Sequence, residues 1–269
     1  MIRLVMAGAA GRMGQIILRL ASRDKAFKIV GALEQSGHAT LGQDLGSILG
    51  QGTMGVKITS DAVATLKNAD VMIDFSHFSA IPGNLNAAIK TRTAYVTGIT
   101  GIPEAILKKI QLASRKIPIV QSPNMSVGVN LLFKLAALAG KALDESYDLE
   151  ISEVHHRMKK DAPSGTALKL LEILLEVRGR DIKKDVIYGR EGETGAREKG
   201  KIGVFALRGG DVIGDHTVSF FGDGERVELV HKASSREAFA RGAILAAKFL
   251  AKKKQGLYHM QHVLGFVDI

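Results

Sequence analysis

The residues of this sequence that are best suited to chemistry lie in one stretch, residues 153–167, with the sequence EVHHRMKKDAPSGTA. The stretch begins at the end of a strand predicted from Leu149 to Val154. It carries the adjacent His155 and His156, followed by Lys159. A histidine with an ordinary pKa of roughly 6.5 can donate a proton near neutral pH, and a lysine supplies positive charge. Because neighbouring residues of an extended strand point in opposite directions, one of the two histidines could be purely structural.

The same stretch ends where a helix is predicted, from Ser164 to Arg178. Ser164 is a favourable N-cap, and the first turn behind it would present the backbone N–H groups of Gly165 and Thr166. Such a helix start attracts anions, carboxylates included. This loop would therefore suit a small acidic substrate that must be protonated. The alternative is a solvated basic loop with a capped helix behind it.

The composition is that of an ordinary globular protein, with 269 residues of which 46% are hydrophobic. The chain has no cysteine, which excludes disulfides, cysteine metal sites and thiol nucleophiles and suits a reducing cytoplasm. Its N-terminus lacks the regions of a signal peptide, and no segment is apolar enough to span a membrane. We therefore expect a cytoplasmic protein without a membrane span, and we identify no metal-binding pattern.

The formal net charge of +10 is compatible with nucleic acid, or with a phosphate-bearing cofactor and an anionic substrate. The positive residues are mostly scattered. The one tight run, Lys252 to Lys254, is predicted to end a helix, where cations interact favourably with the dipole. Aromatic residues make up only 5% and do not alternate with basic ones. These features favour a small anionic partner over nucleic acid.

The N-terminus combines an apolar strand, residues 2–7, with a glycine-rich turn and a helical run from Gln15 to Arg23. The turn has the spacing GxxGxxG, formed by Gly8, Gly11 and Gly14. In a dinucleotide-binding turn the first glycine permits the tight turn and the second lets the backbone approach a pyrophosphate. The third allows the helix to pack closely on the strand. The alternative is a plain glycine-rich connection between strand and helix.

A second strand, residues 28–33, ends at Glu34, which lies 20 positions past Gly14. A dinucleotide-binding fold places at this point the carboxylate that accepts the ribose hydroxyls. Alone, Glu34 could equally be an ordinary acidic strand end. Strand, turn, helix and acid together predict one half of a Rossmann fold.

The chain up to residue 126 continues to alternate between apolar strands and helices. This alternation predicts an α/β fold with a parallel sheet that is covered by helices on both faces. Beyond residue 126 the strand-like runs at residues 203–207, 216–221 and 226–231 predict a mixed sheet and an α+β domain. From Ser234 the chain is predicted to be helical to about Lys254 and to return to the first domain. We therefore expect a Rossmann domain of residues 1–126 plus 235–269, and a second domain of residues 127–234.

Several motifs together resemble the dihydrodipicolinate reductase family, now called 4-hydroxy-tetrahydrodipicolinate reductases. Besides the glycine turn and Glu34, they are GITG at 98–101, SPNMSVGVN at 122–130, the stretch 153–167 and HKASSR at 231–236. The resemblance runs from the first strand to the last helix, and the HHxxKxDAPSGTA segment is highly specific. It implies reduction of a cyclic, doubly carboxylated imine-type substrate with NADH or NADPH, in the diaminopimelate route to lysine. It also implies a homotetramer built by the sheet of the second domain.

The resemblance implies roles for individual residues of the loop. His155 matches the general acid of the family and Lys159 its second proton donor. His156 matches a substrate ligand, and Gly165 and Thr166 match the groups that hold a substrate carboxylate. Arg236 could reach a second carboxylate or could be only a helix-start arginine.

On the cofactor side, Glu34 should bind the adenosine ribose. The pyrophosphate should lie against Gly8, Ala9, Ala10, Gly11, Arg12 and Met13. The nicotinamide side should be lined by Gly98, Ile99, Thr100, Ser122, Pro123, Asn124 and Met125.

The chain departs from the family pattern at two positions. Many members carry arginine directly after the ribose acid, where this chain has Gln35, and the usual GTT is Gly98-Ile99-Thr100 here. The first departure argues against a strong NADPH preference, so we expect both cofactors to be used with NADH favoured. Two other classes of protein remain as alternatives: a Rossmann-type sensor that holds NAD without turnover, and a basic nucleic-acid-binding protein.

Overall fold

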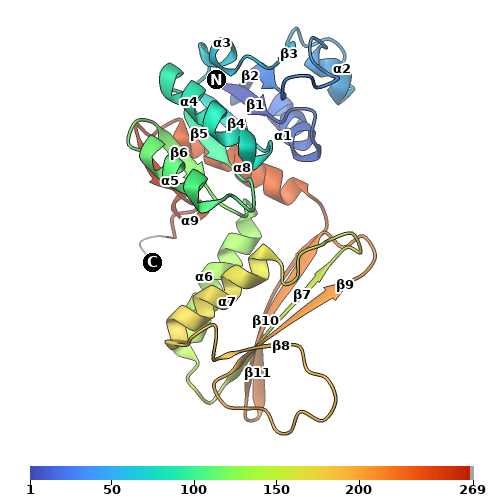
Figure 1. Cartoon of the computed structure of the whole chain (residues 1–269), viewed down its shortest axis with the longest axis vertical. Helices are drawn as coiled ribbons and strands as arrows, with labels where there is room; N and C mark the ends of the chain where they lie inside the picture. The colour runs from blue at the N-terminus through green and yellow to red at the C-terminus, as the bar shows by residue number, and fades with distance from the viewer. Residues whose placement is uncertain (267–269) are drawn as a thin grey trace. The chain divides into compact units, whose positions relative to one another are not determined.

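The computed structural model describes residues 1–266 of the chain, which forms two compact units (Figure 1). One unit contains Met1–Val127 and the chain from Arg236 onward, and the other contains Gly128–Ser235. Residues 267–269, the end of the predicted first domain, lie outside the described residues.

The first unit is built on a seven-stranded sheet in which all neighbouring strands are parallel. In spatial order its strands are β12 (Gly256–Tyr258), β6 (Pro118–Gln121), β5 (Ala94–Thr97), β4 (Val71–Asp74), β1 (Ile2–Ala7), β2 (Phe27–Leu33) and β3 (Ile58–Thr59). Such a sheet is buried on both faces, which explains why its strands read as continuous apolar runs. The predicted Rossmann-like α/β fold is confirmed.

Helices cover both faces of this sheet and form two separate apolar layers. In β1, Leu4 and Met6 belong to one layer and Val5 and Ala7 to the other. The first layer lies under α1 (Arg12–Arg23) and α8 (Glu237–Leu250), and the second under α3 (Ala62–Leu66), α4 (Ile81–Thr91) and α5 (Glu104–Ala113). The helices of the unit are α1 (Arg12–Arg23), α2 (Leu45–Leu49), α3 (Ala62–Leu66), α4 (Ile81–Thr91), α5 (Glu104–Ala113), α8 (Glu237–Leu250) and α9 (Met260–Val263), with a 3₁₀ turn at Phe78–Ala80.

The last part of the chain differs from the prediction. The helix expected from Ser234 to Lys254 is α8, Glu237–Leu250, so the run Lys252 to Lys254 follows the helix rather than ending it. Beyond it, β12 adds a parallel edge strand beside β6, which the sequence did not reveal. β12 has only three residues, all half-buried, and so carries no periodic pattern.

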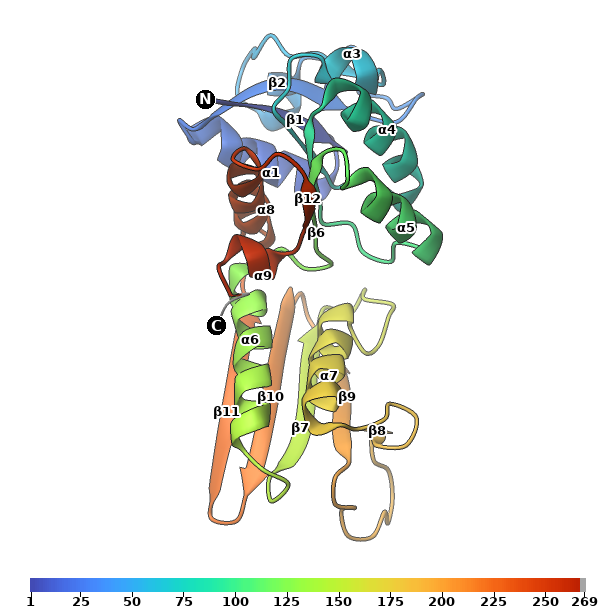
Figure 2. The ribbon, with the colours of Figure 1, turned by 90° about the vertical axis from the view of Figure 1, so that its left-hand side faces the viewer.

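The second unit is a five-stranded mixed sheet with two helices on one face (Figure 2). β7 (Asp148–His155) lies at its centre, antiparallel to β10 (Gly214–Gly222) and parallel to β9 (Ile202–Arg208), which confirms the predicted mixed sheet. The strands in spatial order are β11 (Glu225–Ala233), β10 (Gly214–Gly222), β7 (Asp148–His155), β9 (Ile202–Arg208) and β8 (Val186–Tyr188), and the helices are α6 (Val127–Ala142) and α7 (Gly165–Arg178).

β7 alternates strictly between half-buried and buried residues. Leu149 and Ile151 pack in the apolar layer shared with α6 and α7. Glu153 and His155 continue the same face, because alternate residues of a strand share a face. The strand extends one residue beyond the predicted Leu149–Val154 at each end, and it carries two ionisable side chains into the covered side of the sheet.

Candidate active site

The glycine turn between β1 and α1 has the geometry that its spacing predicts. Gly8 has φ +76°, in the left-handed region that favours glycine. Gly11 is the N-cap of α1. A Cβ atom on Gly14 would lie 2.0 Å from the carbonyl oxygen of Gly8, so only glycine permits this helix to start so close to the strand.

Glu34, at the carboxyl end of β2, lies against this turn. Its Oε1 accepts the backbone N–H of Ala10 at 2.8 Å, while the N–H groups of Gly8 and Ala9 donate to the Leu33 carbonyl. A hydrogen bond therefore joins Glu34 to the glycine turn, although Glu34 and Ala10 lie 24 positions apart in the chain. Arg12 is exposed and Met13 is half-buried, both in the first turn of α1.

The turns after β4, β5 and β6 converge at the same edge of the sheet. A Cβ atom on Gly98 would lie 2.4 Å from the Phe75 ring and 3.1 Å from the Met125 side chain. Ser122 Oγ donates to the Asn124 carbonyl at 2.8 Å and fixes the turn after β6. The side chains of Ile99 and Met125 are buried, those of Thr100 and Pro123 are exposed, and that of Asn124 is half-buried.

The fully buried Asp74, at the end of β4, was not identified from the sequence. Its carboxylate accepts hydrogen bonds from Tyr95 Oη at 2.6 Å and from Asn84 Nδ2 at 2.7 Å. It also accepts the backbone N–H and the hydroxyl of Ser76. Asp74 thus stabilises the turn that borders Gly8. The sequence offered one sign of this role, because Asp74 is a carboxylate at the end of an otherwise apolar strand.

In the second unit, His155 lies buried at the end of β7, with 8% of its surface exposed. Its Nδ1 lies 2.5 Å from Oε2 of Glu153, a carboxylate with no exposed surface. Burial lowers the pKa of His155, and Lys159 and Arg208 add to that effect, whereas Glu153 opposes it. Burial alone would raise the pKa of Glu153, but Arg208 and His155 hold it below its ordinary value.

His156 and Lys159 lie outside this buried pair. The backbone N–H of His156 donates to the Val212 carbonyl at 2.7 Å, and that of Lys159 donates to the His156 carbonyl at 3.0 Å. The Lys159 ammonium forms an ion pair with Asp161 at 3.0 Å. The two histidines thus differ as alternation predicts, since His155 is buried and His156 is half-buried.

The start of α7 confirms the predicted cap. Ser164 Oγ accepts the backbone N–H of Ala167 at 3.2 Å and lies 3.0 Å from Nε2 of His216. Gly165 is exposed and Thr166 is half-buried at the first turn. Among the described residues, nothing lies within 4 Å of a Cβ placed on Gly165, so a ligand could approach the backbone there.

Two further residues of this region were missed by the sequence analysis. Arg208, on β9, donates Nη1 to Oε2 and Nη2 to Oε1 of Glu153, each at 2.9 Å. His216, on β10, packs edge-on against His155 with ring centroids 5.2 Å apart. Burial lowers the pKa of His216 to about 4, and the neighbouring His155 contributes to the shift.

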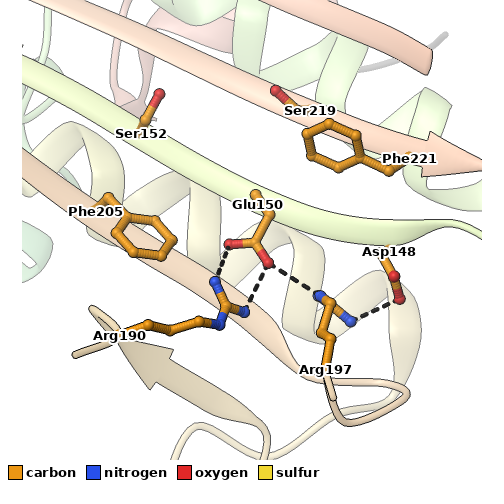
Figure 3. Close-up of a pocket in the computed structure, with 8 residues that line it drawn as sticks. All are labelled: Asp148, Glu150, Ser152, Arg190, Arg197, Phe205, Ser219 and Phe221. Carbon is orange, nitrogen blue, oxygen red and sulfur yellow. Dashed lines mark hydrogen bonds and ion pairs between the residues drawn. The ribbon is translucent and has the colours of Figure 1, made fainter. Parts of the chain in front are cut away.

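A separate pocket lies on the opposite face of the same sheet (Figure 3). Glu150 of β7 points into it and is held by Arg190 at 2.9 Å and by Arg197 at 3.1 Å. None of the predicted site residues lines this pocket. Across residues 1–266, no cluster of three potential metal ligands occurs, and no helix is long and apolar enough to cross a membrane.

Known proteins resemble the chain over its whole length. Family models described as dihydrodipicolinate reductase, N-terminus and C-terminus, match residues 2–125 and 128–264. The 4-hydroxy-tetrahydrodipicolinate reductase of Anaeromyxobacter sp. (strain Fw109-5) is 48% identical over 265 residues, 98% of each chain. That of Magnetococcus marinus is 46% identical over 265 residues, 98% of this chain and 99% of the relative.

A similar fold occurs among solved structures. Dihydrodipicolinate reductase from Paenisporosarcina sp. TG-14, with dipicolinate bound, matches with a TM-score of 0.76 at 23% identity, over 96% of this chain and 97% of that one. An amine dehydrogenase from Mycobacterium smegmatis matches with a TM-score of 0.60 at 14% identity, over 96% and 94%. At these identities the likeness concerns the fold.

Proposed function

Because the chain belongs to the dihydrodipicolinate reductase family, we propose that the loop between β7 and α7 binds and protonates its substrate. The chain is an NAD(P)H-dependent reductase in the diaminopimelate route to lysine. It converts 4-hydroxy-tetrahydrodipicolinate, by way of dihydrodipicolinate, to tetrahydrodipicolinate. The observation that carries our proposal is a buried, carboxylate-paired histidine at the end of β7, joined by one short loop to the capped start of α7.

The first unit suits a dinucleotide, since the positive φ of Gly8 and the close approach at Gly14 require glycine at these two positions of the turn. Under the proposal, residues 8–13 would hold the pyrophosphate and Glu34 the ribose. The turns at residues 98–100 and 122–125 would face the nicotinamide side. The domains would then be a dinucleotide-binding domain of residues 1–126 plus 235–269 and a substrate domain of residues 127–234. When bound, the cofactor supplies the hydride.

His155 is proposed to donate the proton that the electron-rich substrate needs after reduction. Its lowered pKa makes the imidazolium a stronger acid than an ordinary histidine. Lys159, with its ammonium held near Asp161, would neutralise charge that builds up on the ring or donate a second proton. His156 would contact the substrate from the half-buried side of the loop.

The substrate carboxylate is proposed to bind at the start of α7. Gly165 and the hydroxyl-bearing Thr166 form the first turn of a 14-residue helix, whose dipole favours a negative charge there. Arg236, which precedes α8, remains a candidate for the second carboxylate. Loss of either interaction would weaken substrate binding rather than cofactor binding.

We further propose that NADH is preferred over NADPH. A 2′-phosphate next to Glu34 would meet a like charge, and Gln35 cannot neutralise it as an arginine would. Oε1 of Glu34 already accepts a backbone N–H of the glycine turn, which supports a carboxylate fixed close to the ribose position. Other cations, such as Arg12 or Lys57, could still permit the use of NADPH.

The assembly is proposed to be a homotetramer built by the sheet of the second unit, in a cytoplasmic protein. The sheet face opposite α6 and α7 carries the exposed apolar side chains Leu207, Phe221 and Val230. Exposed apolar patches of this kind mark contacts between proteins. Sedimentation of the full chain would test the tetramer.

The reductase activity is tested by following NADH absorbance while the product of the preceding synthase is supplied. His155→Gln should abolish most of the turnover while NADH binding, measured by fluorescence, stays near normal. NADH binding without any oxidation by the unmodified chain would instead favour a sensor. Retention on DNA at moderate salt would favour a nucleic-acid-binding protein.

A further inference from the structure

The buried carboxylate of Glu153 occupies a central place in the second unit. Oε2 is shared between Nδ1 of His155 at 2.5 Å and Nη1 of Arg208 at 2.9 Å. Oε1 is shared between the backbone N–H of Ser164 at 3.0 Å and Nη2 of Arg208 at 2.9 Å. A fully buried charge persists only when it is paired and hydrogen-bonded, and here both oxygens have two donors each. Glu153 therefore links three segments: the end of β7, the end of β9 and the cap of α7.

The ionised state of Glu153 determines the tautomer of His155. Arg208 and His155 keep the pKa of Glu153 below its ordinary value, so the carboxylate is ionised near neutral pH. An ionised carboxylate can only accept hydrogen bonds, so Nδ1 of His155 carries a proton. Nε2 is then the nitrogen that gains and loses the second proton.

The surroundings of Nε2 are consistent with that role. A Cβ atom on Gly214 would lie 2.9 Å from Nε2, so the glycine at the start of β10 leaves space beside it that any larger residue would fill. Gly214 also has φ +158°, at the edge of the region that favours glycine. The ring is thus held at Nδ1 by Glu153, and Gly214 keeps its own position free of a side chain beside Nε2.

We propose that Glu153 is a positioning residue that sets both the proton donor and the carboxylate site. Through Nδ1 of His155 it selects the nitrogen that donates the proton. Through the N–H of Ser164 it fixes the cap from which α7 begins. This role rests on the proposed function of His155 as the general acid.

The charges around His155 predict what loss of the carboxylate does. Lys159 from the loop and Arg208 from β9 both lower the pKa of His155, and Glu153 from β7 raises it. His216, from β10, faces the ring and is itself neutral above a pKa of about 4, and His231 of β11 is opposite His216 in register. Without the charge of Glu153, only the influences that lower the pKa of His155 remain, namely burial and the two cations. The pKa of His155 in Glu153→Gln should therefore fall below that of the unmodified protein.

The kinetic test compares the pH dependence of kcat in the unmodified full-length protein and in Glu153→Gln. A required acid makes kcat decline as the pH rises through its pKa, so the decline should move to lower pH in the variant. At pH 7, kcat should fall by at least about tenfold, and by no more than the ~10²–10⁴-fold that loss of a general acid costs. A purely structural role would lower the amount of folded protein without moving the pH of the decline.

Glu150→Gln is the matched control. Glu150 lies on the same strand and is paired with two arginines, Arg190 and Arg197, as Glu153 is with Arg208, but it points to the opposite face (Figure 3). The pH at which kcat declines should not change in this variant. If Glu150→Gln moves the decline as far as Glu153→Gln does, the shift is a general effect of removing a negative charge. The proposed contact of Glu153 with His155 would then not be its cause.

A measurement on the unmodified protein needs no Glu153 variant, which could fail to fold. In histidine labelled with ¹⁵N, the neutral His155 ring should be the Nδ1–H tautomer, with its signal assigned by its loss in His155→Gln. An Nε2–H tautomer would overturn the proposal. If His155→Gln retains full kcat, the proposed acid is wrong. If His155→Gln is inactive while Glu153→Gln keeps the normal pH dependence, only the role of Glu153 is wrong.

Discussion

Replacement of Gly14 by alanine should damage the glycine turn between β1 and α1 more than the loss of one glycine would suggest. Both Gly14, in α1, and Gly83, in α4, lie in helices, where alanine is intrinsically favoured by about 0.8–1.0 kcal/mol. Nothing lies within 4 Å of a Cβ placed on Gly83, among the described residues. Gly83→Ala should therefore stabilise the protein by up to about 1 kcal/mol.

At Gly14 the same added methyl group meets the protein backbone. Its Cβ would lie 2.0 Å from the Gly8 oxygen and 2.9 Å from the Gly8 carbonyl carbon, whereas real Cβ contacts essentially never fall below 3.0 Å. The helix start or the turn must move by about 1 Å, which for overpacking typically costs 1–3 kcal/mol. The intrinsic gain offsets only part of that cost, so Gly14→Ala should be destabilised by up to about 2 kcal/mol.

The affected carbonyl belongs to the turn proposed to hold the pyrophosphate, so NADH affinity should fall as well. Urea unfolding gives the stability of both variants, and fluorescence titration gives the NADH dissociation constant. We expect Gly14→Ala to lose stability and to bind NADH at least about tenfold more weakly, and Gly83→Ala to bind it normally. Normal stability and normal affinity in Gly14→Ala would show that the close approach at Gly8 is not required.

Four other outcomes are expected. His155→Gln should lower kcat by ~10²–10⁴-fold with an unchanged NADH dissociation constant, and nearly full kcat would remove it from the mechanism. Thr166→Val should raise KM for the substrate by roughly 10- to 100-fold, as expected for about 1.5–3 kcal/mol lost with a hydrogen bond to a charged group; an unchanged KM would place the carboxylate elsewhere. Gln35→Arg should shift the ratio of kcat/KM values toward NADPH by about 1–3 kcal/mol, and a clear NADPH preference before substitution would contradict our assignment. Burial lowers the pKa of His216 to about 4, whereas an unfolded histidine titrates near 6.5, so the unfolded chain binds the proton first as the pH falls. Stability should therefore be lost between about pH 6.5 and 4, by about 3 kcal/mol in urea titrations, and His216→Gln should flatten this dependence.

The parts of the fold that follow from local sequence were predictable. The parallel sheet appears in apolar runs such as residues 71–75 because both of its faces are buried. The cap at Ser164 and the turn at Gly8 depend on a few neighbouring residues, and the structure has both. The edge strand β12 was missed because three half-buried residues give no periodic pattern. Its partner strand β6 is also remote in the sequence, since the paired residues Gly256 and Pro118 lie about 138 positions apart.

The network around Glu153 shows where local reasoning stops. The alternation of β7 puts Glu153 and His155 on the same face as Leu149 and Ile151, so the sequence could have predicted that two ionisable groups are buried. A buried carboxylate requires a cationic partner, and that requirement is also predictable. The identity of the partner is not, because the chain has 37 lysines and arginines and Arg208 lies 55 positions away. Only the parallel pairing of β7 with β9, which sets His155 opposite Arg208, makes the choice. The same pairing explains why Glu153, two residues before the proposed proton donor, looks like an ordinary strand residue until the sheet is assembled.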